Sequence, residues 1–254
     1  MLLANKVAII HGAAGAIGAA TAQAFAREGA ELHLAGRTGE KVEALAAAIR
    51  ADGGRARGAR VDALDEREVE RHAEAVVERA GRIDIVFNAV AVEFVQGKLL
   101  TDLTPMEFEA PITGWTRTQF LTARAAARHM QRQGSGTILT LSASPARLAI
   151  AMTSGFGVAC AAVEALTRTL AAELGPSGVR AVCLRPHRIG ETIGDDPDLP
   201  MSMAEFCGFL SEMTLLKRLP TLDDVANVAA FLASDHARSM TGAVANLTAG
   251  MSVD

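Results

Sequence analysis

The sequence predicts an α/β fold, a doubly wound and mainly parallel seven-stranded sheet with helices on both faces. Apolar runs recur along the chain, and a helical pattern follows each of them. The runs are continuously apolar rather than alternating, which indicates strands that are buried on both faces. No linker divides the 254 residues, so we expect a single domain over 1–254.

The elements alternate in order. The expected strands are Val7–Ile10, Leu32–Ala35, Ala59–Val61, Ile83–Val90, Thr137–Leu141, Val179–Leu184 and Ala243–Leu247. The expected helices are Ile17–Glu28, Glu40–Ala51, Glu66–Ala80, Thr116–Arg132, Phe156–Leu174 and Asp223–Ala233. A segment rich in Pro, Asp and Gly, from Gly190 to Met203, then interrupts the alternation before a short helix near Met203–Met213. We expect residues 190–215 to form a flexible loop and helix over a ligand cleft.

Composition excludes several functions. The net charge of -4 and the pI near 5.9 argue against nucleic acid, because phosphate binding requires clustered Lys and Arg. Three cysteines, Cys160, Cys183 and Cys207, form no CxxC pair and indicate reduced, buried thiols. No stretch approaches the roughly 18 apolar residues of a membrane span. We therefore expect a cytoplasmic protein that binds a small molecule, with no metal site and no nucleic-acid or membrane partner.

A glycine turn follows the first strand. The stretch HGAAGAIG, residues 11–18, opens a helix, and its glycines would let backbone amides approach a pyrophosphate at the helix N-terminus. This position favours dinucleotide binding, although any tight turn between a strand and a helix also prefers glycine. The expected cofactor contacts in the turn are Gly12, Gly15, Ala16, Ile17 and Gly18.

The second strand indicates which dinucleotide binds. It ends in Gly36 and Arg37, where NAD-selective proteins place an acid for the ribose 2′-hydroxyl. A small residue followed by a guanidinium suits a 2′-phosphate, so we expect NADP rather than NAD. The alternative is a solvated surface arginine. Asp62, after the third strand, would accept a hydrogen bond from the adenine amino group or cap the next helix.

These residues, taken with later motifs, resemble the short-chain dehydrogenase/reductase (SDR) family over nearly the whole chain. The later motifs are GRIDIVFNAVA at 81–91, AAVEALTRTLAAELG at 161–175, LRP at 184–186, FLASD at 231–235 and TG at 241–242. The resemblance implies a Rossmann-like fold, NAD(P)-dependent oxidoreductase activity, and a homodimer or homotetramer. It also implies that Asn88, Pro186 and Thr192 lie near the cofactor, with Thr192 at the nicotinamide amide.

The chain departs from the family pattern at the catalytic positions. The family's Tyr-x-x-x-Lys pair falls on Phe156 and Cys160, and its catalytic Asn falls on or near Trp115. The family's serine is kept as either Ser142 or Ser144. Phe156 could pack against a nicotinamide but cannot transfer a proton, and Cys160 is either an inert core thiol or a reactive one. Losing a positioned general acid costs about 10²–10⁴-fold in rate, so ordinary ketone reduction should be slow.

Another acid could replace the missing tyrosine. His187 follows Pro186 at the carboxyl end of the sixth strand, where open α/β sheets place their ligands. It is a candidate acid, or else a surface or backbone-bonded histidine. Glu93 is a weaker candidate, while His11 and His129 have no argued partner.

Three functions remain open. The first is an NADP-dependent oxidoreductase with an atypical site, acting on a substrate that needs no external acid, such as an iminium ion or activated alkene. The second is a catalytically impaired nucleotide-binding protein or subunit partner. The third is a non-redox lyase or cyclase in which His187 or Ser142 transfers the proton.

Overall fold

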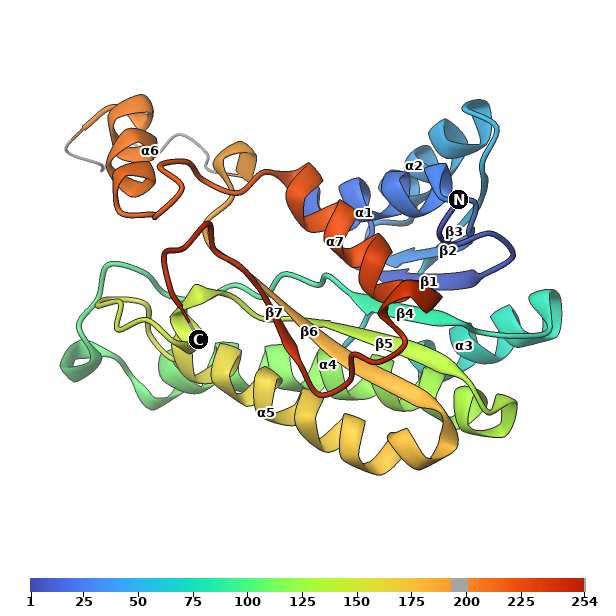
Figure 1. Cartoon of the computed structure of the whole chain (residues 1–254). Helices are drawn as coiled ribbons and strands as arrows, with labels where there is room; N and C mark the ends of the chain where they lie inside the picture. The colour runs from blue at the N-terminus through green and yellow to red at the C-terminus, as the bar shows by residue number, and fades with distance from the viewer. Residues whose placement is uncertain (193–200, 254) are drawn as a thin grey trace.

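The computed structural model, which describes residues 1–192 and 201–253, has the predicted doubly wound sheet (Figure 1). All neighbouring strands are parallel, in the order β3-β2-β1-β4-β5-β6-β7. The strands are β1 Val7–His11, β2 Glu31–Gly36, β3 Arg55–Arg60, β4 Ile85–Asn88, β5 Gly136–Leu141, β6 Val179–Pro186 and β7 Val244–Leu247. The chain reverses its direction of winding between β1 and β4, so a ligand crevice is expected at their carboxyl ends. That residues 1–254 form a single domain stays a prediction.

Helices cover both faces of the sheet (Figure 1). One face carries α1 Ala16–Arg27, α2 Gly39–Ala51 and α7 Leu222–Ala233, and the other carries α3 Glu66–Ala80, α4 Pro105–Gln133 and α5 Phe156–Leu174. Alternate residues of the strands enter the two hydrophobic cores. Leu32 and Leu34 of β2 pack with α1 and α2, whereas Ala35 packs with α3 and α4.

The third strand is longer than the sequence predicted. The expected bounds Ala59–Val61 are wrong, because β3 runs over Arg55–Arg60 and reads RARGAR. It is the edge strand, so its arginines can be exposed while Ala56 alone is fully covered. β4 is shorter than expected, at Ile85–Asn88.

The fourth helix begins about three turns before the predicted Thr116. Thr104 and Glu107 form a capping box in which each side chain accepts a hydrogen bond from the other's backbone N–H. Pro111 lies inside the helix. The proline, together with apolar residues such as Met106 and Phe108 that are exposed, hides the apolar period, which is why the sequence placed the start too late.

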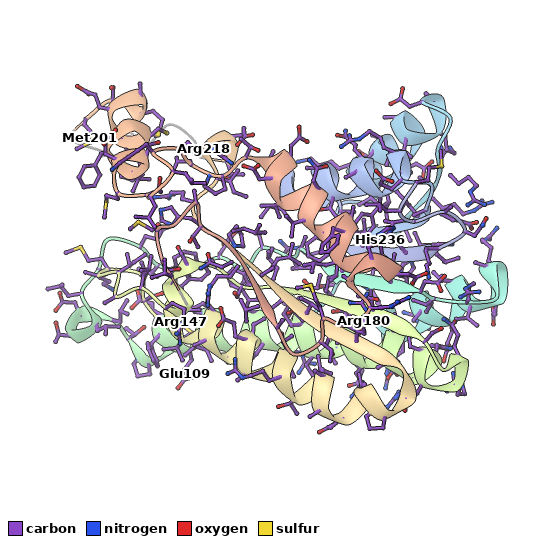
Figure 2. The ribbon with its side chains drawn as sticks, viewed as in Figure 1. Glu109, Arg147, Arg180, Met201, Arg218 and His236 are labelled. Atoms are coloured by element: carbon purple, nitrogen blue, oxygen red, sulfur yellow. The ribbon has the colours of Figure 1, made fainter. Side chains whose placement is uncertain are left out.

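Arg180 of β6 ties the end of α7 to the sheet (Figure 2). Its guanidinium donates to the carbonyl oxygens of Leu232 at 2.8 Å and Met240 at 3.0 Å, and to Thr137 Oγ1 at 2.9 Å. Carbonyl oxygens in and after the last turn of α7, which have no partner within the helix, thus gain a charged donor.

The expected loop over 190–215 is described only in part. Gly190–Thr192 form a short 3₁₀ turn, residues 193–200 lie outside the described residues, and α6 spans Met203–Glu212. Ser202 and Glu205 close a capping box at the start of α6, none of whose residues is fully buried. Within 1–192 and 201–253, no helix combines the length and apolar character that crossing a bilayer requires.

Candidate functional site

The turn between β1 and α1 keeps glycine where a side chain cannot fit. Gly12 has φ +73°, and a Cβ there would lie 2.6 Å from the carbonyl oxygen of Ala89. A Cβ on Gly18 would lie 2.3 Å from the carbonyl oxygen of Gly12. These distances are well inside normal contact, so the backbones of the turn, of α1 and of the β4 end meet directly.

The first turn of α1 leaves its amides without a side-chain partner. Gly15 is the N-cap residue and gives no side-chain cap, and the first turn carries no acidic residue. Ala16 is exposed, so its methyl group does not fill the packed part of the turn, while Ile17 is half-buried against the core. Free N–H groups at the positive end of a helix suit an anionic diphosphate.

A cavity of about 390 Å³ opens beside this turn. The turn, the β2 end and the loop after β4 line it, including Gly36, Arg37, Asp62, Val90 and Glu93. Gly36 lies close to α2, since a Cβ there would meet Val42 Cγ2 at 2.9 Å. Arg37 is exposed and makes no ion pair with any residue that the structure describes.

Asp62 closes a turn rather than capping a helix. Its Oδ1 accepts a hydrogen bond from Leu64 N at 2.9 Å, and the N-cap of α3 is Asp65, whose side chain accepts from Glu68 N. The expectation that Asp62 caps α3 is therefore wrong. Asp62 lines the cavity, and its contact with adenine stays a prediction.

The polar side chains of Asn88 and Thr192 are hydrogen-bonded to other groups of the protein. Asn88 is buried, donates to Thr122 Oγ1 at 2.9 Å and accepts from Val90 N at 2.9 Å. Thr192 donates to the carbonyl oxygen of Ile189 at 2.9 Å. Pro186 is buried at the end of β6. The side chain of Asn88 therefore shapes the β4 end, below the loop that lines the cavity.

Three aromatic rings gather at the start of α5. Phe156 is its first residue and stacks on Phe94 with ring centroids 4.2 Å apart and planes 3° apart. Trp115 also contacts Phe156, with ring centroids 4.8 Å apart and planes tilted by 36°, and it donates from Nε1 to the carbonyl oxygen of Leu141 at 3.2 Å. Phe94 was not expected from the sequence, because it lies in an irregular loop. Packed rings thus occupy the region to which the resemblance assigns a phenol and an amide.

Cys160, one turn further along α5, lies in the interior. It is fully buried, and the backbone of Ala143 and the side chains of Cys183 and Glu164 lie near its thiol. Burial raises the pKa of its thiol to about 12, so it stays protonated and unreactive at neutral pH. The surroundings of Cys160 are those of the inert core thiol, and it does not line the described cavity.

Ser142 joins a buried ion pair. Its hydroxyl donates to Glu164 Oε1 at 3.0 Å, and Arg185 Nη1 lies 3.3 Å from each carboxylate oxygen of Glu164. Arg185 is 1% exposed and Glu164 5% exposed. The sequence contained a signal for this pair, since a charge stands inside an apolar strand and another inside an apolar helix.

Ser144 pairs with His187 at the ends of β5 and β6. Ser144 Oγ lies 2.8 Å from His187 Nδ1, and both residues are buried. Nε2 of His187 is buried and has no hydrogen-bond partner among the described residues. Burial, and then the adjacent Arg188 charge, lowers the pKa of His187 below its ordinary value of 6.5, which keeps the ring neutral at neutral pH. The two serines are therefore distinguished by their partners.

The remaining histidines lie elsewhere. His11 ends β1, lines the cavity and packs edge-on against His72, with ring centroids 5.8 Å apart. Burial, and then the neighbouring His72, lowers the pKa of His11 to about 3. His129 contacts Arg132 on α4, with 2.9 Å between Nδ1 and Nη2.

Two relatives are similar over nearly their whole length. The short-chain reductase protein NovJ of Streptomyces niveus is 33% identical, over 97% of this chain and 94% of its own. The (2S)-[(R)-hydroxy(phenyl)methyl]succinyl-CoA dehydrogenase subunit BbsD of Thauera aromatica is 32% identical, over 100% of this chain and 99% of its own.

Solved structures show the same fold. A gluconate 5-dehydrogenase from Burkholderia cenocepacia, in complex with NADP and tartrate, superposes with a TM-score of 0.88 at 26% identity, covering 98% of this chain and 96% of that one. An NAD⁺-bound xylitol dehydrogenase superposes with a TM-score of 0.89 at 24% identity, covering 98% of this chain and 100% of that one. The family model described as enoyl-(acyl carrier protein) reductase matches residues 12–252. The fold, the glycine turn and these matches agree, and the chain belongs to the short-chain dehydrogenase/reductase family.

Proposed function

We propose that the protein is an NADP-dependent oxidoreductase with an altered catalytic site. Arg37 is the observation that carries the choice of NADP. It is exposed beside the cavity, has no acidic partner among the described residues and follows a glycine that lies against Val42. A guanidinium can hold a 2′-phosphate through two parallel hydrogen bonds. The NADP complex of the similar gluconate 5-dehydrogenase supports the same choice.

The turn residues fit the rest of the dinucleotide. The diphosphate would lie against the backbone at Gly12 and Gly18 and would accept hydrogen bonds from the uncapped amides of α1. When bound, the nicotinamide supplies or accepts a hydride. Asp62 would accept from the adenine amino group across the same cavity.

Ser144 and His187 are the proposed proton-handling groups. The Ser144 hydroxyl would contact the polar atom of the substrate, and His187, neutral at neutral pH, would accept a proton through it or return one. A histidine with a lowered pKa is a weak source of positive charge for a developing alkoxide. The site therefore favours a substrate that needs no external acid, such as an iminium ion or an activated alkene.

A coenzyme titration tests the first part. We expect Arg37→Ala to weaken NADPH binding about 10- to 100-fold and to leave NADH binding within about twofold, because only NADPH carries the 2′-phosphate. Arg27→Ala, an exposed arginine at the end of α1, is the matched control. Equal losses for both coenzymes in Arg37→Ala would contradict the proposal.

A substrate panel tests the chemistry. We expect NADPH oxidation with cyclic iminium ions or nitroalkenes, and slow or no oxidation with simple ketones. His187→Asn should lower any residual ketone reduction and leave iminium reduction within about threefold, because an iminium ion needs no proton in the step. Rapid ketone reduction, or inertness across the whole panel with coenzyme bound, would refute this part.

A second candidate is a non-catalytic partner subunit. Two observations favour it: packed rings at the catalytic positions, and a similar relative that is named as a dehydrogenase subunit. In that case the protein would bind NADPH without turnover and would increase the activity of a catalytic homologue mixed with it.

We also infer self-association through α4 and α5. The two helices pack side by side and expose Phe120 and Val158, at 44% and 49%. Sedimentation equilibrium would show a dimer or tetramer, and Phe120→Glu would shift it toward the monomer.

A further inference from the structure

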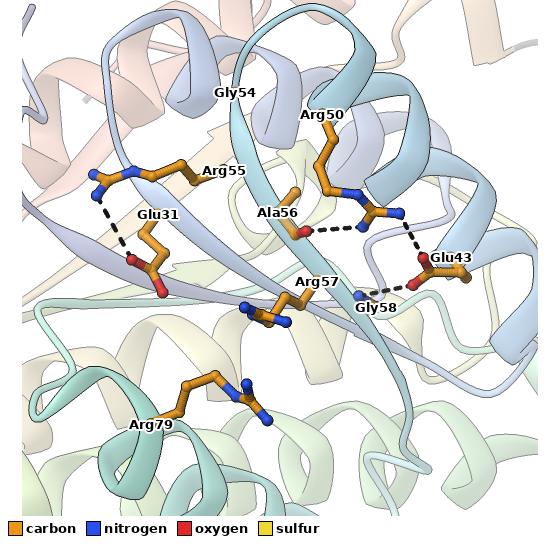
Figure 3. Close-up of a pocket in the computed structure, with 9 residues that line it drawn as sticks. All are labelled: Glu31, Glu43, Arg50, Gly54, Arg55, Ala56, Arg57, Gly58 and Arg79. Carbon is orange, nitrogen blue, oxygen red and sulfur yellow. Dashed lines mark hydrogen bonds and ion pairs between the residues drawn. The ribbon is translucent and has the colours of Figure 1, made fainter.

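A second cavity, of about 630 Å³, lies around the edge strand β3. It is at the amino ends of β2 and β3 (Figure 3), and none of its lining residues also lines the cavity beside the glycine turn. Its charged lining residues are Glu31, Glu43, Arg50, Arg55, Arg57 and Arg79. Nothing in the proposed oxidoreductase chemistry uses them.

The two glutamates are already engaged. Arg50 Nη2 lies 2.7 Å from Glu43 Oε1, and Arg50 Nη1 donates to the carbonyl oxygen of Ala56 at 2.9 Å. Arg55 Nη1 lies 3.7 Å from Glu31 Oε2. Arg57 and Arg79 have no acidic partner among the described residues, so the lining keeps two uncompensated positive charges.

The register brings these two arginines together. Arg57 pairs in the sheet with His33 and lies on the face that Ala35 turns toward α3. The last turn of α3 brings Arg79 to the same face. Figure 3 shows both side chains reaching into the space between β3 and the end of α3. Burial lowers the pKa of His33, nearby Glu31 opposes this shift, and the charges of Arg57 and Arg79 add to it, so both guanidinium groups lie near enough to act on this ring.

His33 is a buried ring beside Arg57 in the sheet, although it does not itself line the cavity. It is 5% exposed, and its Nε2 has no hydrogen-bond partner among the described residues, although Glu31 Oε1 lies 3.4 Å away. A buried ring nitrogen without a partner is costly unless something satisfies it.

Two ordinary structural roles of arginine do not explain why Arg57 and Arg79 reach into the same space. Charged side chains protect an edge strand from pairing, and a basic residue stabilises the end of a helix. Both roles would be filled equally well by arginines that point apart, since like charges repel. Arg57 and Arg79 converge here with no acid of their own, because Glu31 lies against His33 and Arg55, and two such cations instead match a doubly charged anion.

We propose that Arg57 and Arg79 bind a dianionic phosphoryl group of a small ligand at this sheet edge. The site is separate from the coenzyme turn and does not depend on the proposed function.

Calorimetric titration of inorganic phosphate at pH 8, where it is mainly the dianion, tests the site. We expect wild type, Arg37→Ala and the matched control Arg60→Gln to bind with the same affinity. Arg60 is exposed on the other end of β3 and pairs with Glu68. Arg57→Gln combined with Arg79→Gln should weaken binding about 10-fold or more. Glycerol phosphate, titrated in parallel, separates a phosphorylated ligand from free phosphate, and binding of either through both arginines supports the site.

A second measurement follows the ring of His33 by NMR. The charged groups that face it are Glu31 on its own strand, Arg57 on β3, and Arg79 and His72 on α3. Bound phosphate would offset the two arginine charges, so the pKa of His33 should rise in wild type and stay constant in the double variant. The proposal is overturned if phosphate does not bind to wild type, if the double variant keeps full affinity, or if Arg37→Ala loses the binding.

Discussion

The glycine turn at residues 11–18 and the start of α5 lie at the same edge of the sheet, but they differ in how strictly their residue types are required. The turn keeps glycine at positions 12 and 18, where added Cβ atoms would meet backbone at 2.6 and 2.3 Å. The start of α5 has a ring at Phe156 and a buried thiol at Cys160, and neither group can transfer a proton at neutral pH. A backbone-to-backbone approach tolerates no substitute, whereas a reactive side chain can be replaced by any packed group that fills its space.

The largest expected effect is a loss of stability on breaking the buried ion pair between Glu164 of α5 and Arg185 of β6. Glu164→Ala would leave Arg185 buried without its carboxylate, so we expect a loss of about 3–5 kcal/mol in the free energy of unfolding, measured with urea. Glu164→Leu combined with Arg185→Met removes both charges and should cost much less. An unchanged urea midpoint in the single variant would show that the pair does not stabilise the fold.

Sequence patterns predicted the fold well where burial is two-sided. The continuous apolar runs of β1, β5 and β6 gave their positions, but β3 was misplaced because an edge strand can alternate Arg with Ala. The start of α4 was missed because Pro111 interrupts the helical pattern and the apolar residues Met106 and Phe108 are exposed, so they do not follow the buried face.

The site was predictable only where one residue type is required. Glycine turns are local, so Gly12 and Gly18 could be found from spacing. The pairing of Ser144 with His187, and the stacking of Phe94 on Phe156, join residues that are distant in sequence and arise only when β4, β5 and β6 meet. The choice between Ser142 and Ser144 likewise depends on tertiary partners.

The next prediction concerns the close backbone approach at Gly18 in the glycine turn. Gly18→Ala should weaken NADPH binding on the order of 100-fold and lower the melting temperature, because the new methyl group cannot coexist with the Gly12 carbonyl. Gly175→Ala, beyond the last turn of α5, is the matched control, since an added Cβ there would meet nothing within 4 Å. Equal binding by both variants would show that the close approach at Gly18 is not required.

Acid sensitivity should distinguish His11 from His187. Burial lowers the pKa of His11 in the folded state from 6.5 to about 3, so the unfolded chain binds the proton first. Its stabilising contribution is therefore full above pH 6.5 and is lost as pH falls toward 3, with a slope of about 1.4 kcal/mol per pH unit. His11→Asn should reduce this slope in urea titrations between pH 4 and 6.5, and should reduce it more than His187→Asn does. Parallel curves for wild type and His11→Asn would contradict the prediction.

The smallest effect is expected from restoring the missing hydroxyl. Phe156→Tyr keeps the ring contacts with Phe94 and Trp115, so we expect the melting temperature to change little and ketone reduction to rise less than about 10-fold. The phenol would lack a nearby cation to lower its pKa from about 10, because residue 160 is a protonated thiol in the core. Adding Cys160→Lys would bury an ammonium group at a fully covered position, so the double variant should lose stability even as it gains the family's pair. A gain above about 100-fold from Phe156→Tyr alone would contradict this prediction. It would mean that the rest of the site already supports proton transfer and that the missing hydroxyl oxygen alone limits ketone reduction.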